Sequence, residues 1–259
     1  MITDQLSNEE YHASKAISSS DVKTVLKSSI YHWRNKSFKE TPAMALGTAV
    51  HDMALEGGHN TVRGPETRRG SAWKDLEAQC RAEGKVLLPE KEYDTAENIV
   101  EAIMRDGPSQ KVLTDDGTEF EKSIFATCPT TGLELRCRPD IMHRNKGVLG
   151  DIKTTVDASP EGFMRQIYNF RYDVQAAFYT YVCKLAGVKI SHFAFLAAEN
   201  THPHAAHMHV MSLEAMEIGH KDMMFGLNKI AEAQKAEDYS TGWPRFTMIY
   251  PPAWMNTTE

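Results

Sequence analysis

The sequence predicts an α/β fold in which a central mixed sheet is flanked by helices. Three patterns predict it. Helical periodicity dominates the first 110 residues, alternating apolar and polar residues then indicate several strands, and a helical stretch between two strands is typical of a crossover connection. The 259 residues suffice for one domain with a sizeable core. We therefore expect a single domain over 1–259, mainly helical at 1–110, with the core sheet and a C-terminal helix at 111–259.

The first helix is expected to begin within 18–21, where Ser-Ser-Ser-Asp offers N-cap residues before apolar residues at helical spacing. Its apolar positions continue as far as Trp33. A second helix is expected over about 42–55, and the Gly- and Arg-rich stretch 57–71 is expected to be a mobile loop. Further helices are predicted near 72–83, 90–105, 172–185 and 213–237, followed by an extended tail containing Trp243, Pro244 and Trp254.

Strands are predicted where alternation replaces the helical period. The predicted strands cover 120–126, 133–138, 147–154, 190–197 and 206–211. A hairpin through 142–146 would join the second strand to the third. That hairpin would bring Asp140 and Asp151 side by side.

The charge excludes one class of protein. With 29 Lys and Arg against 35 Asp and Glu, the net charge is −6, whereas proteins that coat nucleic acid carry a basic excess. The charge is segregated: residues 15–39 sum to +5, residues 60–74 to +3, and the rest to −14. This pattern is compatible with one basic surface on an acidic body.

Composition also limits where in the cell the protein is expected and which cysteine-bound metal sites it could form. No stretch approaches the roughly 20 apolar residues of a membrane helix, and the N-terminus is polar and acidic, unlike a secretory signal. We expect a cytoplasmic protein with no membrane partner. The four cysteines form no Cys-x-x-Cys pair, which excludes zinc knuckles and iron–sulfur clusters and favours free, buried thiols.

The segment that points to chemistry is Arg-Cys-Arg-Pro-Asp at 136–140, followed by Asp151 and Lys153. Residues two apart on a strand share a face, so Asp151 and Lys153 would converge with Asp140. Adjacent carboxylates repel each other unless a proton or cation lies between them, and their oxygens suit Mg²⁺ or Mn²⁺. With a lysine, such a metal supports phosphodiester hydrolysis. An Asp-x-Lys triplet alone is more often a surface salt bridge.

Three further features strengthen this interpretation, and each has an ordinary alternative. Glu121 lies in the preceding strand and is a third carboxylate, or else a solvated strand residue. His51 lies one helical turn after Gly47, a glycine that is expected to allow close packing. His51 is either a metal ligand or a hydrogen-bonded core histidine. Gln175 and Tyr179 share a helix face, either at the site or in ordinary packing.

The order of these motifs resembles the RecB-type branch of the PD-(D/E)xK nuclease superfamily, and more closely the RecE-type (exonuclease VIII) nuclease domains. Phage recombination exonucleases belong to the same grouping. The resemblance implies the PD-(D/E)xK restriction-endonuclease-like core. It extends over nearly the whole chain, through segments 6–12, 17–20, 47–51, 137–140, 151–155, 172–179 and 243–244.

The resemblance also implies an activity. We expect a Mg²⁺-dependent 5′-to-3′ exonuclease that acts on double-stranded DNA ends and leaves 3′ overhangs for recombination. Mn²⁺ is the expected substitute for Mg²⁺. The expected partners are a single-strand annealing protein and further copies of the chain in a ring-shaped trimer or tetramer, in a bacterial host cell. A RecB-like or Cas4-like nuclease of other polarity, an endonuclease and a non-cleaving DNA-end binding module remain alternatives.

By position, the resemblance assigns roles to the site residues. Asp140, Asp151 and the Ile152 carbonyl would bind metal, and His51 and Glu121 would complete or bridge a second metal site. Lys153 would position the attacking water. Gln175 and Tyr179 would contact DNA or brace the site.

Residues for DNA binding are less sharply defined by the sequence. Ser19 and Ser20, with Lys15, are candidates for a terminal phosphate at a helix N-terminus, against an ordinary N-cap. Arg68 and Arg69 lie in the predicted loop and are expected either to contact phosphates or to be solvated. Arg136 and Arg138 are expected either to contact phosphates or to neutralise carboxylates. We interpret the His-rich run at 202–209 as an exposed strand edge, not a metal site.

Overall fold

The computed structural model describes residues 2–3, 6–37, 41–252 and 255, and Trp254 and Lys39 lie outside them. Its strands are β1 (Ile2–Thr3), β2 (Thr61–Arg63), β3 (Val86–Leu88), β4 (Glu119–Phe120), β5 (Ser123–Thr127), β6 (Glu134–Cys137), β7 (Ile141–His143), β8 (Val148–Thr155), β9 (His192–Glu199) and β10 (Ala206–Val210). Its helices are α1 (Asn8–Ala13), α2 (Ser19–Lys27), α3 (Ile30–Arg34), α4 (Pro42–His51), the π-helix η1 (Asp52–Glu56), α5 (Ser71–Ala82), α6 (Glu90–Arg105), α7 (Gly107–Thr114), α8 (Pro160–Asn169), α9 (Tyr172–Leu185) and α10 (Leu213–Ala236).

The centre of the fold is a five-stranded mixed sheet with the order β10-β9-β8-β7-β4. β7 and β8 form an antiparallel hairpin, and β8 pairs in parallel with β9. Parallel neighbours need a crossover, and α8 and α9 supply it. The predicted mixed α/β fold is therefore confirmed.

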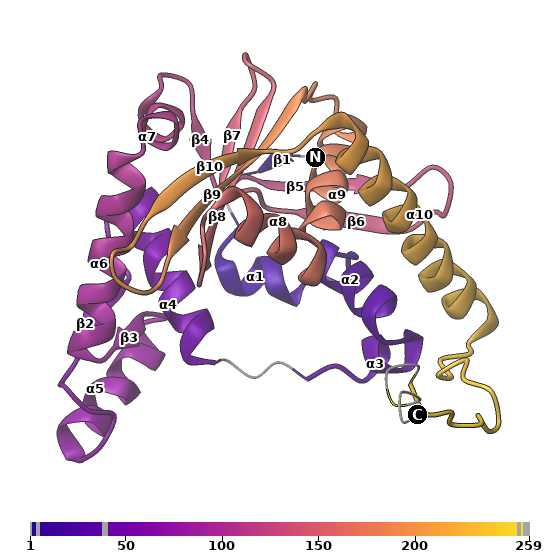
Figure 1. Cartoon of the computed structure of the whole chain (residues 1–259), viewed down its shortest axis with the longest axis horizontal. Coiled ribbons are helices and arrows are strands. Elements are labelled where there is room, and N and C mark those ends of the chain that lie inside the picture. Colours follow the sequence, from indigo (N-terminus) through magenta and orange to yellow (C-terminus); the bar gives the residue numbers. More distant parts are fainter. Residues whose placement is uncertain (1, 4–5, 38–40, 253–254, 256–259) are drawn as a thin grey trace.

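Helices cover both faces of this sheet (Figure 1). On one face, Ala49 and Val50 of α4 and Ile99 of α6 pack with Ile152 of β8. On the other face, α9 and α10 bury a core that also reaches α2 and the smaller sheet β1-β5-β6. Because both faces are covered, β8 buries residues of both parities, so Asp151 is buried as well as Ile152.

The chain passes between the two sheets at two adjacent points. The predicted single strand over 120–126 is wrong, because Glu121 has a left-handed backbone (φ 48°) that divides it into β4 and β5. The second passage runs through Pro139 and Asp140, between β6 and β7. The Glu121 N–H donates to the Asp140 carbonyl over 3.2 Å, so the two passages are bonded to each other.

Other predicted elements are confirmed with small shifts. The helices at 90–105 and 172–185 match α6 and α9, and α2 begins after its N-cap Ser18. The continuation of that first helix to Trp33 is wrong, because α2 ends at Lys27 and α3 follows. The stretch 57–71 is not wholly a loop, since β2 pairs in parallel with β3. Three residues are too few for an alternation to be visible, and the partner strand is distant in sequence. The sequence also missed α1, α7, α8 and β7. The predicted hairpin between 133–138 and 147–154 is wrong, because β6 pairs with β5 in the smaller sheet and the separate strand β7 pairs with β8.

Three further sequence interpretations concern membrane helices, the His-rich run and the cysteines. No helix in the described part of the chain is long and apolar enough to cross a membrane. The His-rich run flanks and enters β10, which is an edge strand as predicted. All four cysteines are free and buried, also as predicted.

The crossing of α9 and α10 depends on a glycine. A Cβ at Gly219 would lie 2.3 Å from the backbone carbonyl oxygen of Asp173, which cannot move as a side chain would. We expect Gly219→Ala to lower the free energy of unfolding by about 1–3 kcal/mol through overpacking, measured by urea denaturation. Gly107→Ala is the control, because a Cβ there meets nothing within 4 Å. Equal stability of the two variants would contradict this close approach.

Candidate active site

The β7–β8 hairpin places two buried carboxylates side by side. Ile141 pairs with Gly150, so Asp140 and Asp151 lie at neighbouring positions of the two strands, as the sequence predicted. Asp140 and Asp151 are 7% and 2% exposed. The Asp140 Oδ2 accepts a hydrogen bond of 2.6 Å from the Ile152 N–H. This bond fixes the Asp140 side chain against β8.

Asp151 is held by two donors. Its Oδ1 forms an ion pair with the Lys153 ammonium, and its Oδ2 accepts a hydrogen bond of 2.5 Å from the Gln175 side chain of α9. Burial disfavours the charged form of Lys153, but the carboxylates of Asp151 and Asp140 outweigh it and raise the Lys153 pKa. Lys153 therefore acts as an ammonium donor at this site.

His51 lies at the last position of α4 and faces two oxygen acceptors. Its Nε2 is 3.1 Å from the Ile152 carbonyl oxygen, and its Nδ1 is 3.5 Å from the Asp140 Oδ1. A neutral imidazole carries one N–H and can therefore donate to only one of these acceptors. Gly47 does not pack unusually closely, because a Cβ there would lie 3.9 Å from the Thr154 hydroxyl.

Glu121 joins the site from the break between β4 and β5, not from within a strand. Burial raises the pKa of its carboxyl to about 7, and the adjacent Glu56 carboxyl, which is hydrogen-bonded to it, adds to the rise. Burial and the Asp151 charge likewise raise the pKa of Asp140 to about 6. Burial is the larger cause in both cases, and the neighbouring carboxylates add to it.

Glu56 is a site residue that the sequence did not reveal. It ends the π-helix η1, five residues after His51. In an α-helix that spacing would turn the two side chains about 140° apart. The wider π-helical turn rotates Glu56 back toward the site, as such turns often do at functional sites. Lys23 of α2, near Gln175, was also missed.

The donor set fits a hard divalent cation in its chemistry. Asp140, Asp151 and the Ile152 carbonyl supply oxygens, with His51 and Glu121 beside them, and Mg²⁺ and Mn²⁺ prefer such ligands. Among the described residues, no three His, Cys, Asp or Glu side chains already surround one point. The carboxylates are instead engaged with Ile152, Gln175 and Lys153. The raised pKa values of Asp140 and Glu121 show that their buried negative charge is disfavoured, which a bound cation would offset.

Of the two α9 residues predicted at the site, Gln175 contacts a carboxylate of the site and Tyr179 packs in the core. Gln175 is 5% exposed and bonded to Asp151. Tyr179 contacts the Phe193 ring edge-on, at 6.3 Å between centroids, and packs against the core. Its described contacts are those of helix packing, and a DNA-contacting role stays a prediction.

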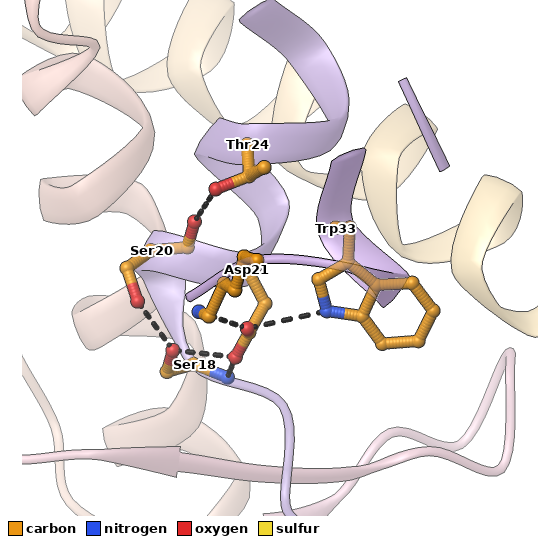
Figure 2. A network of polar contacts seen from close by, with 6 residues as sticks. Ser18, Ser20, Asp21, Thr24 and Trp33 are labelled. Atoms are coloured by element: carbon orange, nitrogen blue, oxygen red, sulfur yellow. Dashed lines mark hydrogen bonds and ion pairs between the residues drawn. The ribbon is translucent and has the colours of Figure 1, made fainter. Parts of the chain in front are cut away.

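The serines at the start of α2 form a closed network (Figure 2). The Asp21 carboxylate accepts hydrogen bonds from the Ser18 N–H and hydroxyl, at 2.8 and 2.6 Å, and the Ser20 hydroxyl bonds to that of Ser18. Ser19 is buried and Lys15 is exposed. The structure here is that of a capped helix, and binding of a terminal phosphate stays a prediction.

The predicted DNA-binding arginines lie in two places. Arg68 pairs with Glu92 at 2.5 Å, and Arg69 is exposed. Arg136 and Arg138 lie 4.8 and 4.2 Å from the centre of the Tyr11 ring. Arg138 also donates to the Ser123 hydroxyl and the Leu6 carbonyl. These contacts anchor the N-terminal segment, and phosphate binding by these arginines stays a prediction.

Comparison with known proteins places the chain in a family. Residues 15–242 match a family described as a PDDEXK-like domain of unknown function (DUF3799). The chain belongs to that family. The structure of a protein described as a "Putative exonuclease" from Eubacterium rectale has a TM-score of 0.66 at 15% identity, with 99% of each chain covered. A second structure, of SSO0001, has 12% identity, a TM-score of 0.28 and coverages of 73% of this chain and 88% of that one, which carries no argument.

The family and the likeness in fold support the PD-(D/E)xK superfamily and a nuclease of the PDDEXK type. The search of curated proteins gives no match. The closer resemblance to the RecE-type domains rests on the motifs alone and stays a prediction.

The raised carboxyl pKa values predict how stability depends on pH. A carboxyl whose pKa is raised by folding stabilises the fold while protonated, and this contribution is lost as the pH rises through the folded pKa. With EDTA present, we expect Glu121→Gln to gain stability over the natural protein between pH 4.5 and 7. The gain should be on the order of 1–2 kcal/mol, reduced by solvent screening of this partly exposed group.

The measurement is urea denaturation at pH 4.5, 6 and 8. Glu119→Gln is the matched control, because the Glu119 carboxylate already pairs with Arg144 at 2.7 Å. This control should show no gain as the pH rises. A pH-independent difference between Glu121→Gln and the natural protein would show that the Glu121 carboxylate is not destabilised by its surroundings.

Proposed function

We propose that this chain is a Mg²⁺-dependent nuclease that degrades the 5′ strand from double-stranded DNA ends and leaves 3′ overhangs. The observation that carries the proposal is the convergence of Asp140, Asp151 and Lys153 on one hairpin, with Gln175 bonded to Asp151. The match to a PDDEXK-like family supports hydrolysis of a phosphodiester. The protein from Eubacterium rectale, which is named as an exonuclease, supports the choice of exonuclease.

The residues of the chain divide the chemical work. Asp140, Asp151 and the Ile152 carbonyl would hold the cation, with His51 and Glu121 beside them. When bound, Mg²⁺, or Mn²⁺ in its place, supplies charge that polarises the phosphodiester and favours ionisation of a water. Lys153 is an ammonium that donates hydrogen bonds, so it orients the attacking water or stabilises charge on the phosphate. Gln175 holds Asp151 in the orientation that this arrangement needs.

The biological setting is also part of the proposal. The 3′ overhangs would serve recombination beside a single-strand annealing protein, in the cytoplasm of a bacterial host cell. Several copies of the chain would form a ring around DNA, as a trimer or tetramer. The exposed apolar side chains of Phe246, Ile249 and Tyr250, at 77–88% exposure, support self-association.

A cleavage assay tests the activity. Linear duplex DNA, labelled at either the 5′ or the 3′ ends, and covalently closed duplex DNA are incubated with Mg²⁺ or EDTA. We expect Mg²⁺-dependent release of 5′ label from linear DNA only. Asp151→Asn should lower the rate by at least about 10²-fold, because it removes a carboxylate charge from the site.

Asp115→Asn is the matched control for this assay. Asp115 is an acidic residue paired with Lys146 near the turn of the same hairpin, but outside the site, so its variant should keep the natural rate. Cutting of closed circles would favour an endonuclease, and release of 3′ label alone would reverse the polarity. End binding without any metal-dependent release would favour a binding module.

A further inference from the structure

A second lysine lies beside the catalytic residues, on an element far from them in sequence. The Lys23 Nζ of α2 is 3.5 Å from the Gln175 side-chain oxygen and 5.5 Å from the centre of the Tyr172 ring. The Lys153 Nζ lies 5.0 Å from the centre of the same ring. Two ammonium groups therefore contact one aromatic ring, next to Asp151.

The charge of Lys23 is poorly compensated. Asp151 and, less strongly, Asp173 favour its charged form, but Asp151 is already engaged by Lys153 and Gln175, and Asp173 by Arg171. Among the described residues no carboxylate forms an ion pair with Lys23, and its hydrogen bond to Gln175 is long. Burial and the Lys153 charge lower the pKa of Lys23 to about 8. Helix packing alone gives no reason to hold a lysine there.

The position of Lys23 is set by its neighbours on α2. Asp21, two residues before, accepts hydrogen bonds from Ser18, from the Trp33 indole at 3.2 Å and from Lys36 at 2.6 Å (Figure 2). Val22 packs over Gly226 of α10, where a Cβ would lie 2.7 Å from the Val22 methyl. These contacts fix α2, so the backbone carries Lys23 to the site in a defined place.

Charges of both signs gather at the site. Glu121 lies near Glu56 and Asp140, and Lys23 and Lys153 lie near Asp151. Crowded carboxylates favour a cation, and crowded ammonium groups favour an anion. A phosphodiester has the charge and the two non-bridging oxygens that a pair of ammonium groups can bind.

We propose that Lys23 is a second phosphate-binding residue of the active site, whose ammonium contacts a non-bridging oxygen of the phosphodiester beside Lys153. This proposal rests on the proposed nuclease function. Gln175 links the two parts of the site, because its amide donates to Asp151 and accepts from Lys23. Lys23 thus brings α2 into contact with the phosphate that is cleaved.

The test compares Lys23→Met and Lys23→Arg with Lys27→Met. Lys27 is the matched control: it lies one turn later on α2, donates to the Asn169 carbonyl at 3.0 Å and lies 5.7 Å from the Phe170 ring centre. Each Met variant loses one positive charge from the same helix. Three quantities are measured: kcat and KM on linear duplex DNA with Mg²⁺, the melting temperature, and the salt dependence of DNA-end binding.

We expect Lys23→Met to lower kcat/KM by about tenfold or more without lowering the melting temperature, and Lys23→Arg to restore most of the loss. In an Asp151→Asn background, Lys23→Met should reduce the slope of log binding constant against log salt by about 0.7–0.9, the value of one phosphate contact. Lys27→Met should leave kcat/KM and the slope near those of the natural protein. A methylphosphonate at the cleaved position should remove the effect of Lys23→Met on binding.

Other outcomes overturn the proposal. Equal losses of kcat/KM in Lys23→Met and Lys27→Met would show that the losses come from the general positive charge of α2 and not from a phosphate contact of Lys23. A lowered melting temperature with no rescue by Lys23→Arg would assign Lys23 to packing. If the natural protein degrades no DNA, the proposed function fails, and the salt slope of binding still decides whether Lys23 contacts a phosphate.

Discussion

The rest of the site depends on the pairing of β7 with β8. This hairpin holds Asp140 and Asp151 next to each other in the protein interior, where two negative charges repel strongly. The approach is close, because a Cβ at Gly150 would lie 3.1 Å from Ile141. The fold offsets the repulsion with the Ile152 N–H, the Lys153 ammonium and the Gln175 amide. Burial and the Asp151 charge still raise the pKa of Asp140, and a bound cation would offset both effects.

The two passages between the sheets explain why further carboxylates gather at this hairpin. Glu121 and Asp140 each lie where the chain leaves one sheet for the other, and a backbone hydrogen bond joins these points. A strand break removes both residues from regular pairing and turns their side chains toward one place. The π-helical turn after α4 adds Glu56 from a third direction. Three irregular backbone segments therefore build the acidic part of a site whose framework is regular.

The net charge of −6 at first argued against a nucleic-acid partner. In the folded chain, part of that acidity belongs to the buried carboxylates around Asp140, which a bound cation would offset. Lys23 and Lys153 come from segments distant in the sequence and lie over the same Tyr172 ring, near Asp151. The total charge thus excludes a protein that coats DNA in bulk, while the local clustering of both charges suits a site that holds a metal and a phosphate together.

The sequence by itself determined the elements with a clear period and the residues that are close along the chain. It predicted α6 and α9, and it predicted the approach of Asp140, Asp151 and Lys153 through a turn near 142–146, because a two-residue strand period and a short turn decide these positions. It did not predict that a separate strand, β7, pairs with β8 while β6 belongs to the other sheet. The tertiary structure decided the break at Glu121, the participation of Glu56 and the position of Lys23. Each of these depends on a contact between distant segments or on an irregular turn: the Asp140 carbonyl, the π-helix, and the packing of α2 on α10. Local periodicity carries no information about such contacts.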